Sequence, residues 1–308
     1  MSVTVVGSIA FDTVRTPFGA RERMLGGAAT HFALAASFFD QVRPVGPVGD
    51  DFTDEHMAVL ATRGTDVSDV ERIPGGKTFF WEGEYGWDLN SRETIDTQLN
   101  VFETFQPKLS EAARACDVLF LANIQPKLQL EVLEACDGPR FTAMDSMNLW
   151  IEIARDDLVK VIERVDCVIL NDAELRQLTE KPNLIQAARE VLSMGPSVVV
   201  GKQGEYGAAL VTPSTFFSLP AYPLEQVIDP TGAGDTFAGG FVGYLAQNTD
   251  GTPSDEALRL AMAYGTAIAS YNVEELGTDR VARLTIDEVH ARVAEIQSLT
   301  SFSLPTKV

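Results

Sequence analysis

The stretch IDPTGAGDTFAGG, residues 228–240, places small residues and one acid at the start of a predicted helix. Gly232, Ala233 and Gly234 allow backbone N–H groups to turn toward one point, where the helix start adds positive potential. We expect this anion hole to bind a phosphate group. Asp235 lies in the first helical turn, so its carboxylate can take the proton of an alcohol that attacks the phosphate. The helix dipole is expected to keep Asp235 ionised at neutral pH.

A purely structural role for Asp235 is the alternative to this chemistry. The carboxylate could complement the helix dipole alone, with the glycines serving close helix packing. The full pattern, with Asp229 six residues before Asp235, favours the catalytic interpretation. No G-x-x-x-x-G-K-[ST] motif occurs in the sequence, and GAGDTFAGG does not complete the dinucleotide fingerprint G-x-G-x-x-G. A dinucleotide-dependent oxidoreductase is therefore disfavoured.

The elements that must position this stretch alternate between short apolar runs and helical patterns. Strands are predicted where compact apolar runs end in a polar residue or glycine, and helix-length segments follow most of them. The predicted strands are 3–10, 42–49, 117–123, 140–146, 166–172 and 197–204. Runs of this kind are typical of strands buried on both faces. The pattern predicts one α/β domain over residues 1–308, a doubly wound and mainly parallel sheet with ligands at the carboxyl ends of its strands.

Two segments, near 12–25 and 75–105, interrupt this rhythm. Residues 75–105 are rich in aromatic residues and threonine, with Phe79, Trp81, Gly83 and Tyr85 at period two. This spacing predicts antiparallel strands inserted into the α/β body. An ordinary surface hairpin is one interpretation. A small β lid over a ligand is favoured, because exposed tryptophan and tyrosine side chains would otherwise form a sticky patch.

The chain resembles the ribokinase-like PfkB family of carbohydrate and nucleoside kinases over nearly its whole length. The motif that carries most of the resemblance is DPTGAGDTFAGGFVGYLA, which is similar to the family's C-terminal signature. Weaker similarities occur in the family's order and spacing: VVGSIAFD, LGGAATHFALAASFF, VGPVGDDF, ILNDAEL and GKQGEYGA. The resemblance implies an ATP- and Mg²⁺-dependent kinase with a ribokinase-like fold.

The resemblance also implies roles for individual residues at the acceptor side. Asp235 would be the catalytic base, beside the anion hole of Gly232, Ala233 and Gly234. Asp12 would bind substrate hydroxyls, and Gly26 with Gly27 would let the substrate approach the backbone. The family's signature often has asparagine where this chain has His31, so His31 is either a substrate contact or a buried core histidine.

For the nucleotide side, the resemblance implies that Asn171 and Glu174 organise Mg²⁺, largely through water. A helix N-cap with a capping box is the alternative for this pair. Lys202, Gly204 and Gly207 would line the nucleotide cleft. Gly265, on the predicted helix 261–272, would lie near the base, with close helix packing as its alternative. Asp145, which follows a predicted strand, is a further candidate near the site.

The predicted activity is the phosphorylation of a primary hydroxyl on a ribonucleoside or pentose-type sugar. The aromatic lid offers a stacking surface that a nucleobase uses better than a sugar does. A kinase of a plain carbohydrate, such as fructose, ribose or a keto-deoxy sugar acid, is the first alternative. A non-catalytic nucleotide or sugar sensor is the second, although a sensor has no reason to keep Asp235.

Composition excludes several kinds of partner. The 308 residues include 44 acidic and 24 basic residues, a net charge of −20, which argues against nucleic acid and anionic membranes. This acidity fits a salt-rich cytoplasm or an ordinary acidic enzyme.

Three cysteines and three histidines without metal-ligand spacing predict reduced thiols and no protein-built transition-metal site. No run approaches the roughly 18 apolar residues that a membrane span needs. No signal-peptide pattern is found either, so a cytoplasmic protein is expected. It would be a monomer, or a homodimer that pairs through the lid.

Overall fold

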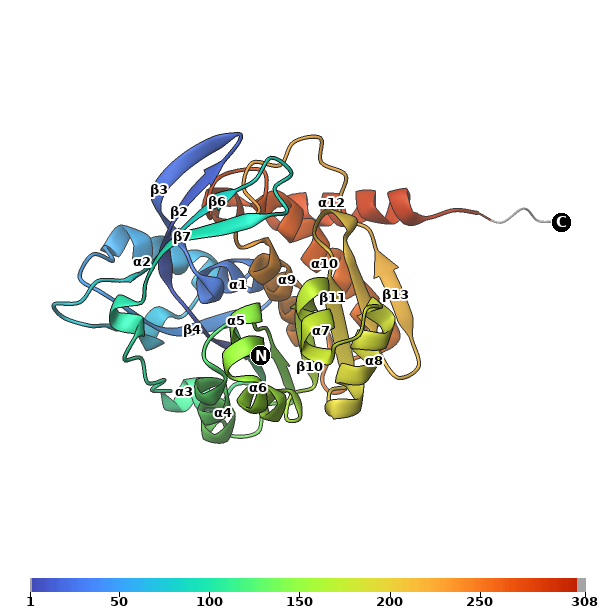
Figure 1. The fold of residues 1–308 in the computed structure, drawn as a ribbon, viewed down its shortest axis with the longest axis horizontal. Helices are drawn as coiled ribbons and strands as arrows, with labels where there is room; N and C mark the ends of the chain where they lie inside the picture. Colours follow the sequence, from blue (N-terminus) through green and yellow to red (C-terminus); the bar gives the residue numbers. More distant parts are fainter. Residues whose placement is uncertain (1, 304–308) are drawn as a thin grey trace.

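The computed structural model describes residues 2–303 as a central sheet covered by helices on both faces, with a second, smaller sheet at one side (Figure 1). Seven strands of the central sheet are parallel, and β12 and β13 continue it antiparallel at one edge. The strand order is β13 (Phe216–Leu219), β12 (Ala208–Val211), β11 (Val198–Lys202), β10 (Cys167–Asn171), β9 (Phe141–Met144), β8 (Val118–Leu121), β1 (Ser2–Val6), β4 (Gln41–Val48) and β5 (Val70–Arg72). The predicted doubly wound α/β fold is confirmed.

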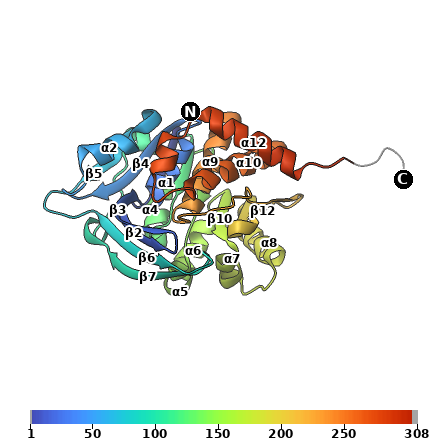
Figure 2. The same cartoon turned by 90° about the horizontal axis from the view of Figure 1, so that it is seen from above.

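The strands of the central sheet are buried on both faces. Their side chains point alternately into two apolar clusters, one on each face of the sheet. Val3 and Val5 face one cluster, whereas Val6 faces the other. Figure 2 shows the two helical layers on either side of the sheet. One layer contains α1 (Ala28–Ala36), α9 (Ala233–Asn248), α10 (Asp255–Asn272) and α12 (Ile286–Thr300), and the other contains α4 (Pro126–Ala135), α6 (Arg155–Ile162), α7 (Asp172–Thr179) and α8 (Leu184–Met194). Strands buried on both faces explain the continuous apolar runs in the sequence.

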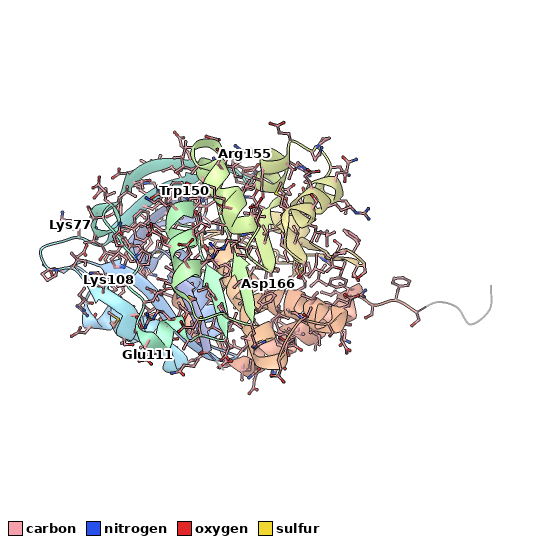
Figure 3. The ribbon with its side chains drawn as sticks, turned by 90° about the horizontal axis from the view of Figure 1, so that it is seen from below. Lys77, Lys108, Glu111, Trp150, Arg155 and Asp166 are labelled. Carbon is pink, nitrogen blue, oxygen red and sulfur yellow. The ribbon has the colours of Figure 1, made fainter. Side chains whose placement is uncertain are left out.

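Short helices complete the two layers and the strand connections. These are α2 (Asp54–Leu60), α3 (Glu111–Arg114), α5 (Asn148–Ile153) and α11 (Asp279–Arg283). Figure 3 labels Trp150 and Arg155, on the segments that follow the carboxyl end of β9, and Asp166, which precedes β10 on the opposite side. The carboxyl ends of β9, β10 and β11 therefore share one end of the sheet. No helix within residues 2–303 is long and apolar enough to cross a membrane.

The second sheet combines the two segments that interrupt the α/β rhythm. Its order is β3 (Gly19–Gly26), β2 (Ala10–Thr16), β6 (Phe79–Tyr85) and β7 (Arg92–Gln98). β6 and β7 form the predicted antiparallel hairpin, but β6 joins β2 in parallel. This parallel junction differs from the expectation of antiparallel strands, since β2 and β6 come from distant parts of the chain. In both views the sheet lies beside the α1 and α9 end of the body.

α9 is held rigidly by glycines that permit close helix contacts. A Cβ on Gly239 would lie 2.3 Å from the carbonyl oxygen of Phe32, and one on Gly243 would lie 2.9 Å from the Cα of Ala36. Both contacts are with α1. On the opposite side, a Cβ on Gly240 would lie 2.9 Å from the Cα of Gly265 on α10. The middle of α9 is therefore packed closely between α1 and α10.

Candidate active site

The start of α9 has the backbone geometry of an anion site. Gly232 is the N-cap residue with φ 71°, a left-handed conformation that favours glycine, and no side chain caps the helix. The N–H group of Ala233 donates to the carbonyl oxygen of Pro230 at 3.2 Å. The sequence predicted that all three small residues offer an amide to the anion, but the amide of Ala233 is already used in this hydrogen bond. The amides of Gly232 and Gly234, together with the helix dipole, are the groups that fit this purpose.

The loop before α9 is fastened by two polar side chains. The buried Asp229 carboxylate accepts the N–H groups of Thr231 at 2.9 Å and Gly277 at 3.0 Å. Asn272, at the end of α10, donates its amide to the carbonyl oxygen of Thr231 at 2.7 Å. These contacts hold the loop without occupying its open side. Asp229 is thereby a structural acid in the motif, because its carboxylate is used to hold the loop.

His31 contacts the loop before α9 through Asn272. Its Nδ1 donates to the side-chain oxygen of Asn272 at 3.1 Å, and only 2% of the residue is exposed. A Cβ on Gly232 would lie 2.4 Å from the His31 ring. Burial lowers the pKa of His31 to about 4, so the ring is neutral. Of the two alternatives for His31, this geometry favours the buried core histidine.

Asp12 and the glycine pair form a second acidic wall. The carboxylate of Asp12 on β2 lies against Gly26, where a Cβ would be 2.0 Å from its Oδ2. Gly27, the N-cap of α1, has φ 94° and donates its N–H to Asp12. Burial raises the pKa of Asp12 to about 7, and the charges of Asp229 and Asp235 act in the same direction. The charges of these three carboxylates are therefore coupled.

Lys202 ends β11 and points to the start of α9. Its ammonium group would lie 3.0 Å from a Cβ on Gly234, directly beside the anion hole. It forms an ion pair of 2.7 Å with Asp145, which follows β9. Burial acts to lower the pKa of Lys202, but the charges of Asp145 and Glu174 outweigh it and raise the pKa. Lys202 remains charged and can contact a phosphate bound at Gly234.

Asn171 and Glu174 form a reciprocal capping box at the start of α7. The Asn171 side chain accepts the N–H of Glu174 at 2.7 Å, and the Glu174 carboxylate accepts the N–H of Asn171 at 2.9 Å. Burial, then the charge of Asp145, raises the pKa of Glu174 to about 7. The capping alternative is therefore present in the structure. The repulsion between Glu174 and Asp145 is what a divalent cation would relieve.

The remaining nucleotide-side glycines have separate positions. Gly204 and Gly207 shape the turn between β11 and β12, with φ values of 58° and 95°. Gly265 is buried where α10 crosses α9, and a Cβ there would lie 2.8 Å from the carbonyl oxygen of Phe237. Close helix packing accounts for Gly265, and its predicted nucleotide contact is not supported by this geometry.

The protonation of Asp235 differs from the sequence expectation. Burial, followed by the charge of Asp145, raises its pKa to about 7, while Lys202 opposes this shift. The helix dipole alone predicted an ionised carboxylate, but desolvation and a neighbouring acid outweigh it. Asp235 is thus poised to accept a proton near neutral pH.

The sequence analysis assigns no role to Arg92 on β7. It names Tyr85 only as one of the aromatic residues of the predicted lid. The Tyr85 hydroxyl accepts a hydrogen bond from Thr231 Oγ1 at 3.1 Å, which joins the second sheet to the anion loop. The charge of Arg92 acts to lower the pKa of Asp12 and Asp235. The alternation of residues 79–85 indicated which sheet face Tyr85 lies on. No motif pointed to Arg92, because its position opposite Tyr85 depends on the register of the hairpin.

Comparisons with known proteins identify the family of the chain. Residues 2–281 match the pfkB family carbohydrate kinases. The chain is 32% identical to a cytidine kinase of Thermococcus kodakarensis over 85% of this chain and 94% of that protein. It is 31% identical to a nucleoside kinase of Methanothermobacter thermautotrophicus over 89% of each chain.

Solved structures show the same fold. The structure of Burkholderia thailandensis nucleoside kinase in complex with inosine has a TM-score of 0.79 and 21% sequence identity, covering 97% of this chain and 98% of that chain. With the matched sequence spanning almost all of the described residues, the chain belongs to the pfkB family of carbohydrate kinases and is an ATP-using kinase.

Proposed function

We propose that this protein transfers the γ-phosphoryl group of ATP to a primary hydroxyl of a ribonucleoside. The observation that carries the proposal is the position of Asp235, with a pKa of about 7, in the first turn of a helix whose open N-terminus lies beside Lys202. A base and an anion site at one helix start are what attack by an alcohol on a phosphate requires.

The residues of the chain divide the work between acceptor and donor. Asp12 hydrogen-bonds a substrate hydroxyl beside Gly26 and Gly27, which leave the backbone open to the acceptor. Asp235 takes the proton of the attacking hydroxyl. The amides of Gly232 and Gly234 and the ammonium group of Lys202 bind the negative charge that develops on the transferring phosphoryl group.

Mg²⁺ is the metal that the family implies, and the donor set fits it. Within the described residues no three His, Cys, Asp or Glu side chains cluster as a metal site. Glu174 and Asp145 supply carboxylates, and Mg²⁺ accepts few protein ligands when waters and phosphates supply the rest. When bound, the ion neutralises phosphate charge. Glu174 and Asp145 would hold it largely through water, with Asn171 fixing Glu174.

The acceptor class rests on the relatives and on the second sheet. Two relatives above 30% identity are named cytidine kinase and nucleoside kinase. Trp81 lies flat across Gly83, where a Cβ would be 2.1 Å from the indole, on the face that also carries Tyr85. An indole face can stack on a nucleobase. The plain-carbohydrate and sensor alternatives are not favoured.

Three further proposals concern the movement of the second sheet, the oligomeric state of the protein and its location in the cell. The second sheet, from segments 12–25 and 75–105, acts as a lid that excludes water, attached to the single kinase domain. The protein acts as a monomer or as a homodimer through this lid, and works in the cytoplasm. Sedimentation of the wild type and of Ile95→Lys, an exposed lid residue, distinguishes the two assemblies.

ADP release tests the proposed function. Purified protein with Mg·ATP is offered cytidine, other ribonucleosides, deoxyribose, ribose and fructose at equal concentrations. We expect the highest kcat/KM with a ribonucleoside. A response to free sugars alone would overturn the acceptor class but leave the role of Asp235 intact. Silence with every acceptor, while ATP still binds, would overturn the kinase reaction for this panel.

A further inference from the structure

Arg92 is an exposed arginine at the first position of β7, directly opposite Tyr85 in the hairpin register. Its guanidinium group lies 5.3 Å from the centre of the Trp81 ring, so it shares the sheet face that carries Trp81 and Tyr85. That face meets the anion loop through Tyr85 and Thr231. Arg92 therefore lies on the side of the lid that is turned toward the site.

The charge of Arg92 acts on both halves of the site. It opposes the rise in the pKa of Asp12 and Asp235 on the acceptor side, and of Glu174 on the nucleotide side. Lys202 is the other basic residue that acts on Asp235 and Glu174.

The end of the hairpin is attached at two points. Tyr85 accepts its hydrogen bond from Thr231 in the anion loop at 3.1 Å. Asn90 donates to the carboxylate of Glu205 at 3.4 Å, in the turn that follows β11. The six residues from 85 to 90 therefore bridge the anion loop and the nucleotide-side turn. Arg92 follows two residues after Asn90, opposite Tyr85.

Arg92 differs from the other lid arginines in its partners. Arg15 pairs with Glu82, Arg21 with Asp279, and Arg23 with Asp51. Across residues 2–303, no carboxylate forms a salt bridge with Arg92. Arg92 instead hydrogen-bonds the Tyr85 hydroxyl, which itself contacts the anion loop at Thr231. The donors of its guanidinium group that Tyr85 does not use are available to an anion.

We propose that Arg92 is a further catalytic residue, which donates hydrogen bonds from the lid to the transferring phosphoryl group. This inference rests on the proposed function. In the step, the acceptor oxygen forms a bond to the γ-phosphorus while the bond to the β–γ bridging oxygen breaks. The bridging electron pair stays on ADP, and the hydroxyl proton passes to Asp235. Arg92 and Lys202 approach the phosphoryl oxygens from the lid and from the sheet, respectively.

Steady-state kinetics of Arg92→Gln and Arg92→Lys test this role. Removing one donor to a developing charge lowers kcat by about 10²–10³-fold, so we expect that loss for Arg92→Gln with KM for ATP within about threefold. Arg92→Lys should recover part of kcat, because it keeps the charge but not the planar fork. The matched control is Arg15→Gln, which removes an arginine from the same sheet that is paired with Glu82.

A binding measurement separates a catalytic role from a structural one. The affinities for Mg·ADP alone and for Mg·ADP with aluminium fluoride are measured by tryptophan fluorescence in the presence of acceptor. Arg92→Gln should weaken the fluoride complex by at least tenfold while ADP binding stays unchanged. Equal weakening of both complexes, or a kcat within threefold of Arg15→Gln, would overturn the proposal. Matched melting temperatures show that the variants are folded.

These outcomes are separable from the proposed function. Every variant is compared with the wild type on whichever acceptor the wild type phosphorylates best, so a wrong acceptor class does not alter the comparison. Loss of activity in Asp235→Asn together with normal activity in Arg92→Gln would leave the kinase reaction intact and overturn the role of Arg92 alone.

Discussion

Replacing Asp145 with asparagine should move the pH dependence of the reaction to lower pH. Asp145 is paired with Lys202 at 2.7 Å, and its charge raises the pKa of both Asp235 and Glu174. The substitution removes this repulsion and leaves the charge of Lys202, which lowers the pKa of Asp235, without its ion-pair partner. Both effects favour the ionised base, so they act in the same direction.

The magnitude follows from the electrostatics of a partly buried site. With a pKa of about 7, Asp235 loses about tenfold of its ionised form for each pH unit below 7. Two unit charges about 6 Å apart interact by roughly 3 kcal/mol at an effective dielectric of 20, which corresponds to about two pH units. Solvent at the partly exposed site reduces this, so we expect a movement of about one pH unit.

The assay is kcat/KM for the acceptor at saturating Mg·ATP from pH 5 to 9. Titration of ATP affects the wild type and the variant equally, so the difference between their midpoints reports the protein. Asp156→Asn, an exposed acid at the start of α6, is the control and should leave the midpoint unchanged. A midpoint in Asp145→Asn that stays within 0.3 pH unit of the wild type, on the order of measurement error, would refute the reasoning, as would an upward movement.

Three further predictions concern stability. Gly232→Ala should lower the free energy of unfolding by roughly 1–3 kcal/mol in urea, because its φ is 71° and the added Cβ meets His31 at 2.4 Å; Gly251→Ala, with open space around it, is the control. The three buried acids with pKa values near 7 bind protons more tightly folded than unfolded, so the melting temperature should fall from pH 5 to pH 8, with a shallower slope in Asp235→Asn; an equal slope would contradict the assignment. The net charge of −20 should make the melting temperature rise between low and molar KCl, and a flat response would remove the proposal of a salt-rich cytoplasm.

The central fold could be predicted because its signals are local. Continuous apolar runs such as VLFL in β8 occur only where both faces of a strand are covered. The anion site at the start of α9 could also be predicted from the sequence, since few other roles explain several glycines and one acid at a helix N-terminus. The parallel junction between β2 and β6 was not visible, because pairing between distant strands leaves no local pattern.

The parts of the site that could not be predicted from the sequence depend on burial and register. Nothing local shows that Asp235 shares its surroundings with Asp145, so the raised pKa could not be expected from the helix dipole. Gly265 has the same residue type whether it approaches a ligand or a helix, and only the crossing with α9 distinguishes them. Arg92 lies opposite Tyr85 because of a register shift in the hairpin.

The measurement that tests the central claim most directly is the activity of Asp235→Asn alongside its affinity for ATP. Asparagine keeps the shape of the side chain but cannot accept the hydroxyl proton, so kcat should fall by about 10²–10⁴-fold. Binding of Mg·ATP should stay within about threefold of the wild type, since the amides of Gly232 and Gly234 and the Lys202 ammonium group are unchanged. A variant that retains kcat within tenfold of the wild type would contradict the assignment of Asp235 as the base.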